Sequence, residues 1–134
     1  LSFMDERMEW LSTAGVSRQQ LIVDPGPDFA KTPAQTVEVL QKIDQLLAYD
    51  RPVLFPVSRK DFIGAITGRP PRERLAGTLA AIAHTLTLTR SGIYRVHDIE
   101  DVRNFLDVWD VLQGHSELGA EVLLDRDLWR APKA

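Results

Sequence analysis

Apolar residues recur every three or four positions in four segments of the chain, and short unbroken apolar runs lie between these segments. The three-to-four-residue repeat is typical of an amphipathic helix, whereas short apolar runs favour buried strands. The expected helices are residues 1–14, 33–50, 75–91 and 99–113. The expected strands are residues 21–23, 53–57 and 93–96. Helix and strand therefore alternate along the chain, with a short apolar turn at residues 62–64.

Residues that favour helix ends mark several of these boundaries. Gly15 and Gly114 follow two of the expected helices and can adopt the left-handed conformation that ends a helix. Thr32 followed by Pro33 is typical of a helix start, because a threonine hydroxyl can accept a backbone N–H and proline is tolerated in the first turn. An apolar stripe reaches Leu1, so the chain is expected to begin inside a helix.

The alternation of strands with helices predicts where the strand ends lie in space. Strands joined by helical crossovers run parallel, and the crossovers are right-handed. Parallel strands share one carboxyl-terminal edge, which is where α/β proteins bind their ligands. The fold class is therefore α/β, and the residues that follow the strands are expected to gather on one face. These residues are Asp24, residues 58–60 and residues 95–98.

Composition restricts the class of protein. With 134 residues, of which 44% are hydrophobic, the chain has the size of one domain and enough apolar side chains for a core. Its 16 basic and 19 acidic residues give a net charge of -3 without a basic block, which argues against a nucleic-acid partner. The absence of cysteine excludes disulfides, thiolate nucleophiles and cysteine-bound zinc. No segment has the apolar length of a membrane span or the pattern of a secretory signal, so a cytoplasmic protein without membrane contact is expected.

Charged residues at the carboxyl ends of the expected strands suggest an anion site. Lys60, Arg95 and His97 lie there, together with the amino-terminal ends of the following helices, which carry partial positive charge. We therefore expect a phosphate or diphosphate ligand. Asp24 follows the first strand and could accept hydrogen bonds from the amidine-like edge of a heterocycle. The alternative is an internal salt bridge between Asp24 and Lys60 or Arg95 without any ligand.

Other polar residues are given no role in the site. Arg69, Arg72 and Arg74 lie in the loop after the second strand, and we interpret this basic loop as a solvated surface, although it could lie over the mouth of the site. His84 and His115 are expected to be packing or solvated residues.

Three short motifs, each at the end of an expected strand, carry a resemblance to a known family. They are Asp24-Pro25-Gly26 with Phe29, Ser58-Arg59-Lys60 with Phe62-Ile63-Gly64, and Arg95-Val96-His97-Asp98. Together, and in this order, they resemble the carboxyl-terminal motifs of dihydropteroate synthases over residues 1–113. The resemblance implies a (β/α)8 TIM barrel, of which this chain would hold the last three parallel strands and their helices in residues 1–114. Residues 115–134 would form a carboxyl-terminal tail.

The resemblance also implies an activity and a role for each site residue. Dihydropteroate synthases condense 6-hydroxymethyl-7,8-dihydropterin diphosphate with 4-aminobenzoate, a transferase step of folate biosynthesis that releases diphosphate. The implied pterin ligands are Asp24, Lys60 and Arg95. Arg95 and His97 would bind the diphosphate and, with Lys60, would form the catalytic group. The implied border of the aminobenzoate pocket is Phe29, Ser58, Arg59 and Asp61. Magnesium is implied as a cofactor, with its protein ligand in a segment that precedes this chain.

Two residues depart from the family pattern. Asp28 stands where many members have a second glycine after Asp-Pro-Gly, and Asp61 stands where many have serine or arginine after Ser-Arg-Lys. Aspartate tolerates left-handed backbone better than most residues. The Asp61 carboxylate would face the aminobenzoate carboxylate, and two like charges about 4 Å apart repel by roughly 4 kcal/mol at an effective dielectric of about 20.

These departures leave other functions open. The chain could belong to a diverged paralogue that binds pterin without synthase activity, or to an accessory or interaction protein. A pterin-dependent methyltransferase of the same barrel class is disfavoured by the Ser-Arg-Lys and Arg-Val-His motifs, because that chemistry needs no diphosphate site. The isolated chain is expected to be inactive. Its open sheet edges are expected to need either the amino-terminal half or a second copy, as in a homodimer.

Overall fold

The structure is a computed structural model that describes residues 2–125 and 128 of the chain. Leu1 and, within the expected tail, residues 126–127 and 129–134 lie outside the described residues. The α-helices of the described part are α1 (Ser2–Thr13), α2 (Pro33–Gln41), α3 (Asp44–Leu47), α4 (Asp61–Thr67), α5 (Leu75–Leu86) and α6 (Ile99–Leu112). Its strands are β1 (Val53–Phe55) and β2 (Gly92–Tyr94), and Arg18–Gln20 and Pro71–Glu73 form short 3-10 helices. The chain divides into two compact units, Leu1–Ile99 and Glu100–Ala134.

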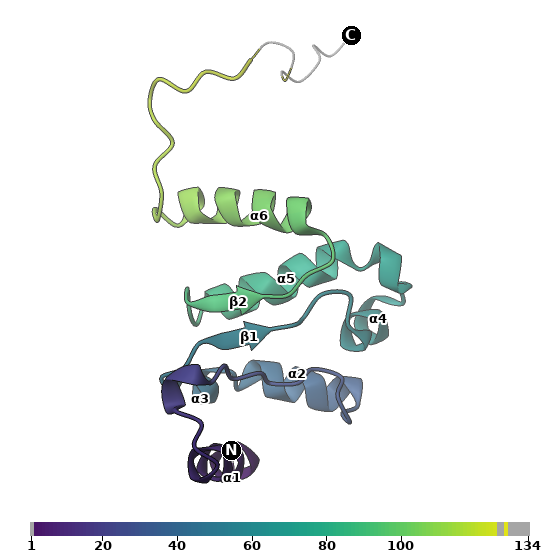
Figure 1. Cartoon of the computed structure of the whole chain (residues 1–134). Helices are drawn as coiled ribbons and strands as arrows, with labels where there is room; N and C mark the ends of the chain where they lie inside the picture. Colours follow the sequence, from purple (N-terminus) through teal and green to yellow (C-terminus); the bar gives the residue numbers. More distant parts are fainter. Residues whose placement is uncertain (1, 126–127, 129–134) are drawn as a thin grey trace. The chain divides into compact units, whose positions relative to one another are not determined.

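The strands of the first unit are parallel, as the alternation of helix and strand predicted. β1 and β2 lie side by side and point the same way in Figure 1, and their register pairs Val53 with Gly92 and Phe55 with Tyr94. Val23 forms a further parallel bridge with Val53. β1 therefore lies between Val23 on one side and β2 on the other.

The paired segments are shorter than the expected strands. Of residues 21–23, only Val23 pairs, so the first strand is reduced to a single bridge. Within the described part of the chain, this segment has a neighbouring strand on one side only. Few backbone hydrogen bonds are therefore available to lengthen it. β1 ends at Phe55 rather than Val57, because Pro56 has no N–H to donate to a neighbour. β2 covers residues 92–94 instead of 93–96.

Apolar side chains from the strands and from α2 to α5 form the core of the first unit. The buried ones are Val23, Leu40, Ile43, Leu46, Val53, Phe55, Val57, Phe62, Ile63 and Ile82. The rings of Phe55 and Tyr94 stack between β1 and β2 with their centroids 5.5 Å apart. Tyr94 Oη and Thr85 Oγ1 of α5 form a hydrogen bond of 2.8 Å. Burial raises the pKa of Tyr94, so its hydroxyl stays protonated in the core.

The expected helix ends at Gly15 and Gly114 are confirmed. Both glycines have positive φ angles, 85° and 71°. After α1, Val16 N donates to Leu11 O at 2.9 Å. Gly15 N donates to Ser12 O at 3.0 Å, which completes a Schellman motif. The same pair of bonds follows α6 at Gly114.

The helix expected over residues 33–50 starts as predicted but is broken in the middle. Thr32 Oγ1 accepts a hydrogen bond from Gln35 N at 3.3 Å, and Gln35 Oε1 accepts one from Thr32 N at 2.8 Å. Between α2 and α3, backbone hydrogen bonds span three residues, as in a 3-10 helix. With about three residues per turn, Leu40, Ile43 and Leu46 fall on one face, and all three are buried.

The short turn expected at residues 62–64 is instead the helix α4. Its side chains Phe62 and Ile63 are buried. The first N–H of the helix, on Asp61, donates to Asp28 Oδ2 at 2.6 Å. Side-chain acceptors of this kind stabilise the start of a helix. Because the acceptor lies 33 positions earlier in the chain, no local pattern indicated the helix.

No helix in the part of the chain that the structure describes is both long and apolar enough to cross a membrane. Residues 115–125 form turns and irregular backbone. The division into a barrel part of residues 1–114 and a tail stays a prediction.

Candidate functional site

The segments that follow Val23, β1 and β2 carry the predicted site residues, and the structure brings several of them together. The pairs are Ser58 Oγ with His97 Nδ1 (2.9 Å), Arg59 with Asp98, and Lys60 Nζ with the centroid of the Phe29 ring (5.0 Å). These contacts join the turn after β1 to the segment after β2 and to the loop after Val23. Asp24 and Arg95 form no hydrogen bond or ion pair with the other site residues among those that the structure describes.

Asp24 organises the loop that follows the first parallel segment. Its side chain is half-buried, and Oδ1 accepts a hydrogen bond from Gly26 N at 2.7 Å. Lys31 closes the same loop, because its Nζ donates to Gly26 O at 2.9 Å and to Phe29 O at 3.1 Å. The charged ammonium group of Lys31 therefore binds carbonyl groups of the loop itself. Asp24 Oδ2 accepts no hydrogen bond from any described residue, so this oxygen remains available to a ligand.

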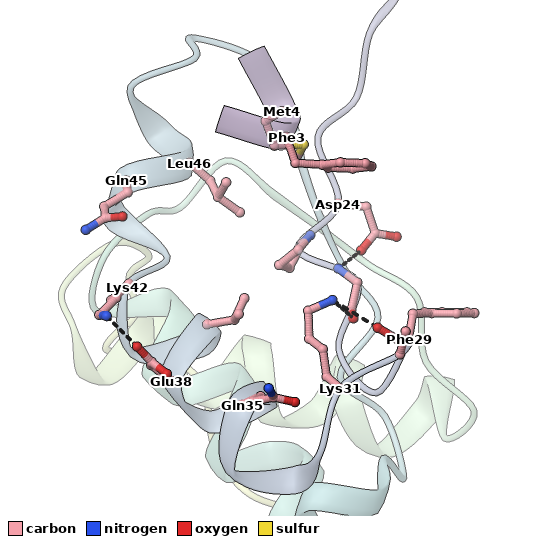
Figure 2. Close-up of a pocket in the computed structure, with 14 residues that line it drawn as sticks. Phe3, Met4, Asp24, Phe29, Lys31, Gln35, Glu38, Lys42, Gln45 and Leu46 are labelled. Atoms are coloured by element: carbon pink, nitrogen blue, oxygen red, sulfur yellow. Dashed lines mark hydrogen bonds and ion pairs between the residues drawn. The ribbon is translucent and has the colours of Figure 1, made fainter. Parts of the chain in front are cut away.

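A cavity of about 790 Å³ opens beside this loop (Figure 2). Its wall is formed by α1, by the loop that contains Asp24 and Phe29, and by α2 and α3. Lys60, Arg95 and His97 do not line it. The cavity therefore includes only a part of the predicted site, and the side-chain contacts at the strand ends define that site better.

Ser58 sets the orientation of His97. Ser58 is buried, and its Oγ accepts a hydrogen bond from His97 N at 3.2 Å. The hydroxyl proton is then free to be donated to His97 Nδ1, 2.9 Å away. In a neutral His97 the ring proton is consequently on Nε2. His97 is exposed, so this Nε2–H can donate to an anion.

Arg59 is held at both its backbone and its side chain. Its φ angle is 57°, in the left-handed region. Its N–H donates to Thr78 Oγ1 at 3.0 Å. Its guanidinium binds both carboxylate oxygens of Asp98, with Nε to Oδ2 at 3.0 Å. The hydrogen bond from Arg59 lowers the pKa of Asp98, so the pair stays charged at neutral pH.

Lys60 and Arg95 keep their charges available for a ligand. Neither forms an ion pair with any residue of the described part of the chain, and Arg95 is exposed. The alternative of an internal salt bridge from Asp24 to Lys60 or Arg95 is therefore not seen. Two cations without a counter-ion among the described residues suit a bound anion.

Asp28 and Asp61 are joined to each other through the start of α4. Asp28 has a φ angle of 65°, in the left-handed region that aspartate tolerates better than most residues. Its Oδ2 accepts from Asp61 N at 2.6 Å, and its own N–H donates to Thr36 Oγ1 at 3.0 Å. The Asp61 carboxylate is 79% exposed, and its Oδ1 lies 3.0 Å from Arg74 Nη1. Asp61 is thus already paired with a cation of this chain.

The interpretation of the basic loop as a solvated surface is wrong for Arg74. The Arg74 side chain is only 10% exposed. Its Nη1 donates to the backbone oxygens of Arg59 at 2.9 Å and Lys60 at 3.1 Å. Arg69 and Arg72 are exposed, as expected. The sequence places all three arginines in one polar loop and does not indicate that the Arg74 side chain is largely covered.

Several known proteins resemble this chain in sequence, in fold or in both. A family model described as pterin binding enzyme matches residues 1–97. The chain is 38% identical over 117 residues to dihydropteroate synthase type-2 of Escherichia coli, a match that covers 84% of this chain and 42% of the relative. It is also 38% identical over 103 residues to inactive dihydropteroate synthase 2 of Mycobacterium leprae (strain TN), covering 75% of this chain and 34% of that protein. A solved structure of the dihydropteroate synthase from Xanthomonas albilineans, in complex with 7,8-dihydropteroate, has a TM-score of 0.77 and 34% identity, covering 84% of this chain and 43% of that one.

The chain spans less than half the length of these relatives. All of the predicted site residues, from Asp24 to His97, lie within the residues that the family model matches.

Proposed function

The chain belongs to the pterin-binding enzyme family, and on that premise we propose that it supplies the diphosphate side of the catalytic site of a dihydropteroate synthase. Its fold is a part of the α/β barrel of these enzymes. The observation that carries the proposal is that Lys60 and Arg95, which follow the parallel strands β1 and β2, have no counter-ion among the described residues, while Ser58 orients His97. The complete enzyme would join 6-hydroxymethyl-7,8-dihydropterin diphosphate to 4-aminobenzoate.

We assign the pterin to Asp24, Lys60 and Arg95. The unbound oxygen of Asp24 can accept hydrogen bonds from the amino-pyrimidine edge of the ring. Lys60 can donate to oxygen and nitrogen atoms of the ring. The planar guanidinium of Arg95 can stack on the ring while its N–H groups reach the diphosphate, because arginine combines a flat face with several donors.

Arg95 and His97 act on the leaving group. In the reaction, the bond between the pterin methylene carbon and the diphosphate oxygen breaks, and the amine nitrogen of the second substrate forms a bond to that carbon. The amine then loses a proton to solvent. Arg95 and the Nε2–H of His97 stabilise the negative charge that builds up on the departing diphosphate. Preorganised donors of this kind act on the transition state, and Ser58 preorganises His97.

The second substrate is assigned to the side of the site that holds Phe29, Ser58, Arg59 and Asp61. The Phe29 ring is 63% exposed and offers an aromatic surface to 4-aminobenzoate. Ser58 and Arg59 are engaged with His97 and Asp98, so we assign them to the wall of this pocket rather than to direct binding.

A second candidate is a pterin-binding protein without synthase activity. Asp28 and Asp61, which add two carboxylates near the start of α4, favour it because they would oppose a ligand with a carboxylate. A relative in Mycobacterium leprae that is named inactive shows that sequences this similar exist without the activity.

We further propose that magnesium acts with the diphosphate and is held by residues outside this chain. Among the described residues, no three His, Cys, Asp or Glu side chains lie close enough together to hold a metal ion. We also propose that the amino-terminal half of the enzyme, or a second copy of the chain, covers the open edges of the sheet, and that the protein works in the cytoplasm.

Calorimetric titration of the complete protein with pterin diphosphate, diphosphate alone and 4-aminobenzoate tests the function. A synthase is expected to bind pterin diphosphate, to bind 4-aminobenzoate once diphosphate is present, and to form dihydropteroate. Binding of the pterin without binding of 4-aminobenzoate would favour the second candidate. Binding of none of the three ligands by the folded protein would show that the proposal is wrong.

Replacing Asp61 by serine is expected to tighten 4-aminobenzoate binding and to leave pterin affinity unchanged. Because Asp61 is exposed and paired with Arg74, screening limits the gain to about 1 kcal/mol, or roughly fivefold. Calorimetry in the complete protein measures both affinities. Asp107→Ser is the matched control, since Asp107 is also exposed and paired with an arginine but lies on α6. Equal affinities for 4-aminobenzoate in both variants would show that Asp61 does not oppose the ligand.

A further inference from the structure

The turn at Arg59 has a backbone conformation that needs support. Residues other than glycine rarely adopt a φ angle of 57°, because the Cβ atom crowds the backbone. Such a conformation persists where the surrounding structure determines it, and it is often found at functional sites. The turn leads directly into Lys60, which is the residue before α4. The direction of the Lys60 side chain therefore depends on how this turn is held.

Thr78 and Arg74 hold the turn from its two sides. Thr78 is fully buried, and its Oγ1 accepts from Arg59 N at 3.0 Å. Arg74 Nη1 donates to Arg59 O at 2.9 Å and to Lys60 O at 3.1 Å. The N–H and the C=O of Arg59 are thus both bound by residues at the start of α5. These residues are one helical turn apart, so α5 acts as a rigid support.

Arg74 is itself held in place by its neighbours. Its Nε donates to Arg69 O at 2.8 Å, and Asp61 Oδ1 lies 3.0 Å from its Nη1. Its guanidinium lies against Gly64 of α4, where an added Cβ atom would be 2.2 Å from Nη2 and 2.5 Å from Cζ. Any side chain at position 64 would therefore displace the guanidinium.

We propose that Arg74 and Thr78 are positioning residues, which set the Arg59–Lys60 turn so that Lys60 is directed at the substrate, and that Gly64 provides the space for Arg74. The inference rests on the proposed function, because Lys60 is assigned there to the pterin. Lysine cannot replace Arg74, since two donors in a fixed plane are needed to bind neighbouring carbonyl groups and to reach Arg69 O as well.

Gly64→Ala in the complete protein separates positioning from stability. Alanine favours a helix over glycine, so the variant is expected to keep its melting temperature while the guanidinium of Arg74 is displaced. The synthase kcat/KM is expected to fall by about tenfold or more, because small misplacements of catalytic groups lower the rate strongly. If Arg74 had a structural role alone, its displacement would lower kcat/KM only together with the melting temperature.

Arg74→Lys and the pair Thr78→Val and Thr78→Ser test the two supports separately. Arg74→Lys and Thr78→Val are expected to lower kcat/KM. Thr78→Ser keeps the hydroxyl and is expected to leave kcat/KM unchanged. Amide hydrogen exchange at residues 59–61 is expected to accelerate in Gly64→Ala, Arg74→Lys and Thr78→Val. Arg72→Ala is the control, since Arg72 lies in the same loop, is exposed and is outside these contacts.

Unchanged kcat/KM in folded Gly64→Ala and Arg74→Lys, with unchanged amide exchange at residues 59–61, would overturn the proposal. If Gly64→Ala does not fold, kcat/KM and amide exchange at residues 59–61 in Arg74→Lys and Thr78→Val test the proposal in its place. An unmodified protein that forms no dihydropteroate would count against the proposed function instead. In that case amide exchange still tests whether Arg74 and Thr78 hold the turn, and unchanged exchange would overturn the inference on its own.

Discussion

Replacing Arg95 by alanine is expected to weaken binding of pterin diphosphate by about a thousandfold. Arg95 lies just after β2, is exposed and has no carboxylate partner among the described residues, so a bound anion would be its main partner. Truncating one partner of a hydrogen-bonded charge pair that is buried in the complex costs about 2–5 kcal/mol. A loss of about 4 kcal/mol corresponds to a thousandfold change in the dissociation constant. Calorimetry with the complete protein measures the change directly.

Two comparisons make this measurement specific. A pterin without the diphosphate is expected to lose less affinity than the diphosphate form, because only stacking on the ring is removed. Arg103→Ala is the matched control, since Arg103 is an exposed arginine whose partner is Asp107 on the same helix. Equal losses for both pterin forms would show that Arg95 does not bind the diphosphate. An unchanged affinity for both would remove Arg95 from the site altogether.

Expressed alone, the 134 residues are expected to associate or aggregate and to synthesise no dihydropteroate. Two sides of the parallel segments have no partner strand in the described part of the chain: the outer side of Val23 and the outer side of β2. Apolar side chains are exposed on these segments, with Ile22 at 57% and Ile93 at 41%. At about 25 cal/mol per Å², several hundred Å² of apolar surface left in water costs on the order of 10 kcal/mol. That is comparable to the whole stability of a domain.

Light scattering of the isolated chain at several concentrations checks this expectation. Ile93→Lys is expected to reduce association, because a charge on an edge strand opposes pairing with another strand. Ile66→Lys is the control, since Ile66 is an exposed apolar residue of α4 away from the sheet edges. A stable monomer that synthesises dihydropteroate would contradict the expectation and the assignment of roles to residues outside this chain.

Much of the fold followed from local patterns. The periodic apolar residues predicted α1 and α6 close to their observed bounds, and Gly15 and Gly114 end their helices as expected. The start of α5 was also predicted, but this helix ends at Leu86 rather than at residue 91. The parallel pairing of β1 with β2 followed from the alternation of strands and helices. These features depend on residues near one another in sequence or on general rules of chain connection, so a single sequence is sufficient to predict them.

The sequence also predicted which residues would share the site, but not what each contacts. Asp24, Lys60, Arg95 and His97 were assigned from their positions after the strands. The pairing of Ser58 with His97, and of Arg59 with Asp98, joins residues 39 positions apart. Contacts of this kind depend on the distance and orientation of packed elements, which no local pattern records. Of the four residues expected to border the second substrate, Ser58, Arg59 and Asp61 are bound to other side chains.

The sequence by itself determined the α/β class, the parallel strands and the family, and it predicted a cluster of cations at the strand ends. The tertiary structure alone decided that the Arg74 side chain is largely covered, that Asp28 caps α4, and that Arg59 is held in a left-handed turn. The physical reason is the same in each case. The free energy of these conformations comes from hydrogen bonds between distant residues, and polar side chains bury themselves only where the fold supplies their partners.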